Sequence, residues 1–570
     1  MIRPSFAGTT LLGALCLVAS CHGLDPELRA LVEATQEIEQ KHVGPSVEPA
    51  SSGPARFVKV LHEGFRPTRA RELVAFIDRY YRAPANEGYE AVLGKLEADL
   101  KEIGFGGEDT RLFLDFLETE EMNAWTPLSG KIVLRVEGEE PQTLHAFSKG
   151  DEVDRVMLPV NTPACALTGD IALALNDITQ GSVFVTDVAV GQVMSRAKSR
   201  GAAAILSASL RAFNFDKEGK DRHREAIQFT TLAPGTDLPV FQISARSKEA
   251  IEAAVERAHT RGAAARLELS SVVKFEKRPL RTMMAMIEGA KRPGEAIAMV
   301  SHVQEPGACD NASGVAGLLE GVRALVASLR DKKLSWPDRS LVFLWGDEFT
   351  QSSSWLDSTD LTCVAGISSD MTGQKREETG AIALLERNYD PGALKVYKPD
   401  FHTPWGAGVV DPEDITPNGL AVVARCAMAD VNALEGGAWW TAEHPWEGGS
   451  DHDIFIRRGI PAVLFWHFTD FTYHTSLDRM GFLDPEEMRR TGVALLATGL
   501  SLASPEPGDL DRYLRSLDLE IALRVEVAAE QKDEEQAARW ESWSKGTREW
   551  LINQCRGYAE KLPDPANSKK

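Results

Sequence analysis

The sequence SHVQEPGACDNASGVAGLLE, residues 301–320, joins the end of one apolar run to the start of an apolar helix. Residues 296–300 have the length and composition of a buried strand, and His302 follows them almost at once. Asp310 stands just before the helix, where a carboxylate is favoured by the helix N-terminus. A strand that leads through a polar loop into a helix is typical of α/β folds.

Three further apolar runs, at 340–345, 363–367 and 461–466, also lead into residues of the metal-binding type. In open α/β sheets, ligands bind beyond the carboxyl ends of the strands, so these residues are expected to meet at one edge. Imidazole and carboxylate groups are the ligands that Zn²⁺ accepts. The pattern therefore predicts a metal site formed by His302, Asp310, Glu348, Asp370 and His474.

Taken singly, each of these residues has an ordinary structural explanation. A lone histidine is more often hydrogen-bonded within the protein than bound to metal, and Asp310 could be a helix cap. Glu348 and Asp370 could belong to solvated turns. Their occurrence in this order, each after an apolar run or before a helix, favours the metal site.

These residues and their surroundings resemble the M28 family of dinuclear zinc exopeptidases, an aminopeptidase-like group. The resemblance rests on residues 301–320 and on four further motifs: LWGDEF (344–349), SSDM (368–371), EGGSDHDIF (447–455) and YHTSLDR (473–479). It covers residues 281–505 well and 57–150 weakly. It implies an α/β fold with a mixed-sheet zinc exopeptidase (phosphorylase/hydrolase-like) body, two Zn²⁺ per chain, and removal of N-terminal residues from peptide substrates.

The resemblance also implies how the ligands are shared. Asp310 would bridge the two metal ions. His302 and Asp370 would complete the shell of one ion. Glu348 and His474 would complete the shell of the other.

Four other residues receive roles from the same resemblance. Asp347 stands where the family places its general base, although the family uses Glu, which is one methylene longer. Tyr473 matches a position that can stabilise a developing oxyanion. Asp451 and His452 would support the ligands from a second layer. A further departure is Gln304, because the family has an Asp there that orients the first metal-binding histidine.

Residues 151–272 differ in character from the segments on either side. Strand patterns at 182–187, 201–206 and 239–243 alternate with helical patterns at 192–200 and 247–259. The segments SRAKSRGAAAILSAS (195–209) and LPVFQIS (238–244) resemble a protease-associated (PA) domain. We therefore expect a peptidase body at 57–150 and 273–505, a PA-like insert at 151–272 and a helical C-terminal appendage at 506–570.

The N-terminus reads as a secretory signal, with Arg3 before an apolar run that ends near residue 18. Residues 18–21 resemble a bacterial lipobox, which implies cleavage before Cys21 and attachment of lipid to it; the alternative is an ordinary secretory signal. We thus expect residues 1–21 to be removed or lipidated, a tether at 22–56 with a helix at 28–40, and a cell-envelope lipoprotein exported across a bacterial inner membrane.

Composition limits the remaining possibilities. Lys and Arg total 63 against 84 Asp and Glu, so the net charge of −21 argues against nucleic acid and leaves the lipid anchor as the expected membrane contact. Beyond the signal region five cysteines are widely spaced, which excludes a cysteine-type zinc site and permits one or two disulfides. Oligomeric state and side-chain preference leave no pattern in the sequence.

Two other functions stay open from the sequence. Asp347 and Gln304 replace the usual residues, so the chain could be a catalytically weak peptide-binding or scaffold protein of the same fold. Glutaminyl cyclases share this fold, so a cyclising acyltransferase is a third possibility. The PA-like insert favours the peptidase over the cyclase.

Overall fold

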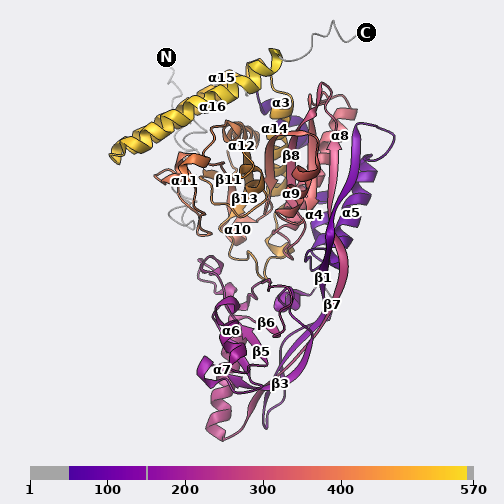
Figure 1. The fold of residues 1–570 in the computed structure, drawn as a ribbon, viewed down its shortest axis with the longest axis vertical. Coiled ribbons are helices and arrows are strands. Elements are labelled where there is room, and N and C mark those ends of the chain that lie inside the picture. Colours follow the sequence, from indigo (N-terminus) through magenta and orange to yellow (C-terminus); the bar gives the residue numbers. More distant parts are fainter. Residues whose placement is uncertain (1–50, 149–151, 561–570) are drawn as a thin grey trace, which may run out of the picture.

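The computed structural model describes residues 51–148 and 152–560. Figure 1 shows three parts along its longest axis: an α/β body in the middle, a smaller unit at one end, and two long C-terminal helices at the other. The predicted α/β body with a helical C-terminal region is confirmed. The expected signal segment, Cys21 and the helix at 28–40 lie outside the described residues.

The body is built around one half of a 13-stranded mixed sheet. Its strands are β7 (Ala265–Ile287), β8 (Arg292–His302), β9 (Arg339–Gly346), β10 (Thr362–Ser369), β11 (Ile382–Glu386), β12 (Thr441–His444) and β13 (Ala462–Phe468). In the centre β9, β8, β10 and β13 lie side by side and run parallel. Every residue of β9 is buried, as expected for a parallel strand that is covered on both faces.

Helices cover the sheet and complete the main hydrophobic core. They are α3 (Ala55–Gly64), α4 (Pro67–Ile77), α5 (Glu87–Ile103), α8 (Ala312–Arg330), α9 (Thr350–Ser358), α10 (Arg376–Thr379), α11 (Pro391–Leu394), α12 (Leu420–Leu434), α13 (His452–Ile456) and α14 (Pro485–Ala503). Helix α8 is long and apolar enough to cross a membrane, but it lies almost wholly buried in the body. It contacts α3, α4 and α14, so residues from 55 onward belong to the body.

Two very long strands connect the body with the smaller unit. β1 (Leu112–Val136) pairs antiparallel with β7 from Leu112 opposite Ile287 to Val136 opposite Ala265. The register shifts twice, at Glu118/Glu121 and at Pro127/Ser129. Figure 1 shows both strands running from the body into the smaller unit. This pair of strands, hereafter the ribbon, therefore belongs to the sheets of both parts.

The smaller unit, hereafter the insert (residues 152–272), has its own sheet and cores. It contains β3 (Cys165–Ala172), β4 (Val183–Thr186), β5 (Ala204–Ser207), β6 (Val240–Gln242), α6 (Val190–Ser199) and α7 (Ala245–Arg261), and the hairpin partner β2 (Gln142–Phe147) precedes it. Strands β3 to β6 are parallel to one another, and β3 pairs antiparallel with β7. The strands and helices predicted for this segment are present, and its likeness to PA domains stays a prediction.

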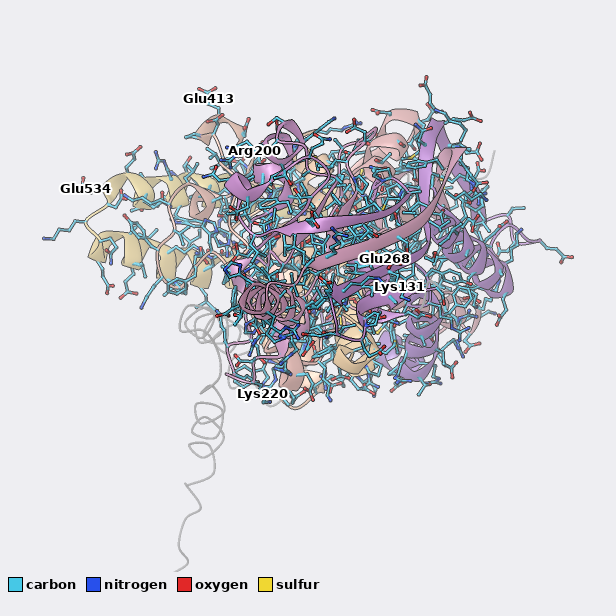
Figure 2. The ribbon with its side chains drawn as sticks, turned by 90° about the horizontal axis from the view of Figure 1, so that it is seen from below. Lys131, Arg200, Lys220, Glu268, Glu413 and Glu534 are labelled. Carbon is cyan, nitrogen blue, oxygen red and sulfur yellow. The ribbon has the colours of Figure 1, made fainter. Side chains whose placement is uncertain are left out.

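The C-terminal appendage consists of α15 (Leu510–Glu530) and α16 (Glu534–Glu560). Figure 2 shows the pair projecting beyond the body at Glu534. Leu510 and Leu517 are buried in the main core, as the spacing of apolar residues predicted. All five cysteines of the described part, from Cys165 to Cys555, are free thiols, so the permitted disulfides do not form there.

Candidate metal centre

Neighbouring parallel strands bring the predicted ligands to one edge of the sheet. His302 is the last residue of β8, and Asp370 follows the last residue of β10. Asp347 and Glu348 follow β9 directly. Because these strands lie side by side and run in the same direction, their carboxyl ends deliver the side chains to a shared site.

His302 is the centre of a first group of ligand-type atoms. Its Nε2 atom lies 3.1 Å from Oδ1 of Asp370. The same nitrogen lies 3.9 Å from Oε1 of Glu348 and 3.9 Å from Oδ1 of Asp310. Asp310 does not cap α8, because the side chain of Asn311 accepts the Gly314 N–H instead, and this leaves the carboxylate for the site.

His474 is the centre of a second group, which shares Asp310 with the first. His474 Nε2 lies 2.9 Å from Oδ2 of Asp310 and 3.1 Å from Oε1 of Glu305. The grouping differs from the expectation, since Glu348 was expected beside His474 but lies with His302 and Asp370. Glu305 was missed by the sequence analysis, although it lies inside the quoted 301–320 segment.

The donor set fits divalent metal ions. His302 Nε2, Asp310 Oδ2 and Asp370 Oδ1 are buried, and within the described part of the chain none of them forms a hydrogen bond of good geometry; their close neighbours are the other ligand-type atoms of the site. Buried polar atoms are normally hydrogen-bonded, so orphaned nitrogen and carboxylate atoms that face one another indicate a missing partner. Two imidazoles with four carboxylates form the mixed N and O donor set that suits zinc.

The imidazoles and carboxylates of the two ligand groups shift one another's pKa values. Burial alone would raise the pKa of Asp310, but the hydrogen bond and charge of His474 and the charge of His302 outweigh it and lower that pKa to about 2. Burial and the nearby Asp310 raise the pKa of Glu305 to about 7. Carboxylates thus compete for positive charge in this site, which is a setting that attracts cations.

Neighbouring groups fix the ligands in place. His302 Nδ1 lies 3.3 Å from the main-chain oxygen of Gln304, so a backbone carbonyl stands in the orienting place where an Asp side chain was expected. The Gln304 side chain instead accepts the Glu348 N–H at 2.8 Å. Ser450 donates to Oδ2 of Asp370 at 2.9 Å. Gln304 therefore joins two of the ligand-bearing loops rather than simply weakening one.

Asp478 was also missed as a supporting residue, although it lies in the quoted YHTSLDR motif. Its carboxylate accepts the backbone N–H groups of Cys309 at 2.7 Å and Asp310 at 2.8 Å. Gly307 packs so closely against this carboxylate that a Cβ atom there would lie 2.0 Å from Oδ2. Asp478 therefore holds the backbone that presents the shared ligand Asp310.

The two predicted supporting residues lie in different surroundings. Asp451 accepts hydrogen bonds from Phe349 N, Gln351 Nε2 and Ser352 Oγ, and so anchors the turn that follows Glu348. His452 Nε2 lies 2.8 Å from Glu386 Oε1, away from the two ligand groups. Asp451 thus supports the site through the turn, whereas His452 belongs to a neighbouring buried network.

Asp347 and Tyr473 each directly precede a predicted ligand, Glu348 and His474 respectively. Asp347 accepts the Thr350 hydroxyl at 2.8 Å, and burial raises its pKa to about 6. The Tyr473 ring stacks on the imidazole of His474, with ring centroids 3.9 Å apart. Burial and the charge of Asp310 raise the pKa of Tyr473 well above its ordinary value, so its hydroxyl keeps its proton and can donate.

The insert holds the loop that carries His474. The His474 carbonyl accepts the Phe229 N–H and the Gln228 side-chain amide, both at 2.7 Å. Asn214 Nδ2 donates to the Tyr473 carbonyl at 2.7 Å. His474 has a φ of 54°, in the left-handed region that residues other than glycine seldom adopt, so its backbone needs such support. These insert residues, which sequence reasoning missed, position a predicted ligand.

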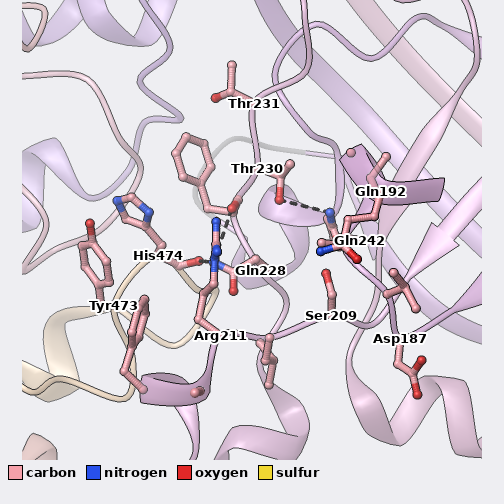
Figure 3. Close-up of a pocket in the computed structure, with 18 of the residues that line it drawn as sticks. Asp187, Gln192, Ser209, Arg211, Gln228, Thr230, Thr231, Gln242, Tyr473 and His474 are labelled. Atoms are coloured by element: carbon pink, nitrogen blue, oxygen red, sulfur yellow. Dashed lines mark hydrogen bonds between the residues drawn. The ribbon is translucent and has the colours of Figure 1, made fainter. Parts of the chain in front are cut away.

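A cavity of about 1030 Å³ opens between the insert and the body. Figure 3 shows Tyr473 and His474 on one side of it and Gln192, Ser209 and Gln242 of the insert on the other. A second cavity, of about 570 Å³, adjoins the turn after Glu348 and is lined by the aromatic side chains of Phe349, Trp405 and Trp446. Trp405 borders both cavities.

One family model matches part of the body. Residues 282–406 match the sequence model of peptidase family M28, and they include all the β8, β9 and β10 ligands. Within the body, this segment of the chain is similar in sequence to peptidase family M28. No curated protein matches the whole sequence significantly.

Solved structures are similar to this chain at low sequence identity. A zinc aminopeptidase from Bacillus subtilis aligns with a TM-score of 0.50 and 14% identity, over 77% of this chain and 94% of that one. A peptidase M28 precursor from Shewanella amazonensis aligns with a TM-score of 0.49 and 15% identity, over 84% and 97%. An aminopeptidase from Aneurinibacillus sp. strain AM-1 gives 0.46 and 16%, over 78% and 96%. The match of residues 282–406 to family M28 supports a metal-dependent peptidase, a hydrolase.

Proposed function

We propose that the protein is a dinuclear zinc aminopeptidase that removes N-terminal residues from peptides outside the cytoplasm. One observation carries the proposal: the His302 and His474 groups share Asp310, whose Oδ1 atom faces the first histidine and whose Oδ2 atom faces the second. A carboxylate with one oxygen toward each of two donor groups is suited to bridging two metal ions.

The ligand assignment follows the two groups. His302, Asp370 and Asp310 would hold one ion, and His474 and Asp310 would hold the other. Glu348 and Glu305 are the further carboxylates: Glu348 stands near the first ion site, and Glu305 lies 3.1 Å from His474 at the second while also close to His302 and Asp310. Zinc bound there would act as a Lewis acid on the scissile carbonyl.

The remaining chemistry belongs to side chains of this chain. Asp347, ionised above a pKa of about 6, would accept a proton from the attacking water and return it to the leaving amine. Tyr473, which stays protonated, would donate a hydrogen bond to the developing oxyanion. The acidic surroundings of Glu305 suit a free N-terminal ammonium group, which favours an aminopeptidase.

The aromatic cavity beside Glu348 supports the same proposal. Phe349, Trp405 and Trp446 offer an apolar wall for the side chain of an N-terminal residue. Gly449 makes this wall possible, since a Cβ atom there would lie 2.3 Å from the Trp405 ring, and its φ of 96° also favours glycine.

The function is tested by metal content and hydrolysis measured on the same preparation. Zinc per chain would be determined on the purified mature protein, and a panel of aminoacyl chromogenic substrates assayed with and without a chelator. We expect two zinc ions and activity that the chelator abolishes. Undiminished activity without metal would refute the proposal. Zinc-loaded but inert protein would favour a peptide-binding role, and cyclised product from an N-terminal Gln peptide a cyclase.

We further propose that Cys21 carries lipid and holds the protein at the bacterial cell envelope. The support is the lipobox-like sequence at residues 18–21, behind an apolar signal segment. A Cys21→Ser variant should lose incorporation of labelled fatty acid and leave the membrane fraction. Equal labelling of the variant and the original protein would contradict the assignment.

A further inference from the structure

We infer that the cavity between insert and body binds short peptides by their free C-terminal carboxylate, with Arg211 as the residue that binds it. The inference rests on the proposed function, because Glu305 and His474 of the candidate metal centre line the same cavity. It adds a substrate class, namely short peptides with both termini free.

The backbone of Arg211 is tied to the wall of the metal centre. Its N–H group donates to Oδ1 of Asn214 at 3.2 Å, across the short helix η4 (Ala212–Asn214). Asn214 in turn donates to the carbonyl of Tyr473 at 2.7 Å and to that of Phe471 at 3.1 Å. Three hydrogen bonds thus link the backbone of Arg211 to the segment that precedes His474.

The side chain of Arg211 is a positively charged group that can bind a carboxylate. It is exposed, lines the cavity, and forms no ion pair with any residue of the described ranges 51–148 and 152–560. Among the described residues that line this cavity, no other is a lysine or arginine. Figure 3 shows Arg211 between Tyr473 and His474 on one side and Ser209 on the other. A guanidinium group with free donors is the usual protein partner of a carboxylate.

The cavity offers both signs of charge, which matches a zwitterionic peptide. A second carboxylate, that of Asp187, also lines it, on the side of Ser209 away from Tyr473 and His474 (Figure 3). Glu305 lies at the metal centre, where the ammonium group of the substrate would lie, and Arg211 supplies the positive charge. Uncharged polar groups also line the cavity, including Ser209, Gln228 and Thr230, and they can donate to and accept from peptide groups. A volume of about 1030 Å³ is at the upper end of the roughly 300–1,000 Å³ of small-ligand sites, so it suits a short peptide.

The test compares one peptide in two forms. The tripeptide Leu-Gly-Gly with a free C-terminal carboxylate and the same tripeptide as its C-terminal amide would be hydrolysed by the zinc-loaded protein. We expect kcat/KM to be higher for the acid by about tenfold or more, as for a hydrogen bond to a charged group. Arg211→Gln should lower kcat/KM for the acid to the value for the amide and leave the amide unchanged.

An Arg200→Gln variant is the matched control. Arg200 is an exposed arginine of the same insert that does not line the cavity, so its removal changes net charge equally and should keep the preference (Figure 2). Equal kcat/KM for acid and amide in the original protein would overturn the inference while leaving the aminopeptidase intact. If neither form is hydrolysed, the proposed function fails, and calorimetric binding of the two peptides to the original protein and Arg211→Gln decides the inference by the same comparison.

Discussion

Glu305 acquires its place beside His474 through its backbone. Its φ of 83° lies in the left-handed region, and its N–H group donates to the carbonyl of Arg82 at 2.8 Å. The Arg82 side chain also donates to the carbonyls of Val303 at 2.8 Å and Gly307 at 2.7 Å, so it fixes the loop on both sides of Glu305. A single buried arginine therefore shapes the segment that carries this carboxylate.

A Glu305→Gln substitution should weaken metal binding on the His474 side. Gln offers a neutral oxygen in place of a carboxylate, so we expect one zinc ion per chain to be lost at lower chelator concentration and the other to be retained. Zinc content during dialysis against graded chelator measures this. A Glu348→Gln variant provides the comparison, since its carboxylate lies with His302 instead. Unchanged retention of both ions in Glu305→Gln would contradict the grouping.

An Asp347→Asn substitution should separate turnover from metal binding. The amide has nearly the same shape but cannot accept a proton, so we expect kcat to fall by roughly 10²–10⁴-fold, as for loss of a general base. Zinc content should match that of the original protein, because Asp347 belongs to neither ligand group. Thr350→Val, which removes the hydroxyl bonded to Asp347, is a milder control. Full turnover in Asp347→Asn would exclude it as the base.

Among the elements, the loop before His474 depends most on its neighbours. It leaves β13 and reaches the site only where Gln228 and Asn214 of the insert bind its carbonyl groups. Ser476 and Ile227 add a pair of hydrogen bonds, one from each backbone N–H group, at 2.9 and 3.0 Å. The insert thus forms part of the scaffold of the candidate metal centre.

A Gln228→Ala substitution should loosen that scaffold without unfolding the chain. Loss of a group that orients a metal ligand typically lowers metal affinity by about tenfold to a hundredfold, and we expect this for one of the two zinc ions. Zinc dissociation constants from competition with a chromogenic chelator measure the effect. Gln192→Ala is the matched control, because Gln192 lines the same cavity without a side-chain bond to the loop. Equal zinc dissociation constants for both variants would show that the hydrogen bond from Gln228 has no influence on metal affinity.

The sequence predicts that side chains at the ends of β8, β9 and β10 meet, because each position follows from a local rule. An apolar run marks the strand, and parallel neighbours carry their ends to one edge, so His302, Glu348 and Asp370 meet. No local rule predicts the roles of Gln228 and Asn214, because their partners lie 246 to 259 residues away in sequence. The place of Glu305 could not be predicted for a related reason. Arg82, more than 200 residues upstream, fixes the loop that carries it.

Over the whole molecule, the C-terminal helices are joined to the body by buried charges. Arg425 of α12 binds Glu443 at 2.9 Å and Glu520 of α15 at 2.7 Å. Arg524 of α15 binds Glu520 at 2.9 Å and also Asp400. All five side chains are almost fully buried, so this network ties the appendage to the body in a way that no charge pattern in the sequence indicates.

A Glu520→Gln substitution should destabilise the whole chain. It leaves Arg425 and Arg524 each short of a buried partner, which typically costs about 3–5 kcal/mol. Burial alone would raise the pKa of Glu520, but the charges of Arg425 and Arg524 lower it to about 2. The stabilisation by Glu520 is therefore complete above its ordinary pKa and is lost as the pH falls toward about 2.

Urea denaturation at several pH values measures this contribution. The free-energy difference between the original protein and Glu520→Gln should be largest near neutral pH and shrink in acid. Glu526→Gln is a control on the same helix, since Glu526 is exposed. A difference that does not depend on pH would contradict an electrostatic origin.

The ribbon of β1 and β7 has a consequence for how the protein melts. Each strand is continuous from the body into the insert, over 25 and 23 residues respectively, so neither part can lose its sheet without breaking the edge of the other. Insert and body should therefore unfold together, in one calorimetric transition whose enthalpy agrees with the van't Hoff value. Two separated transitions would mean that the paired strands β1 and β7 can break between the insert and the body. Heat should thus remove the metal centre and the wall of its cavity in the same step.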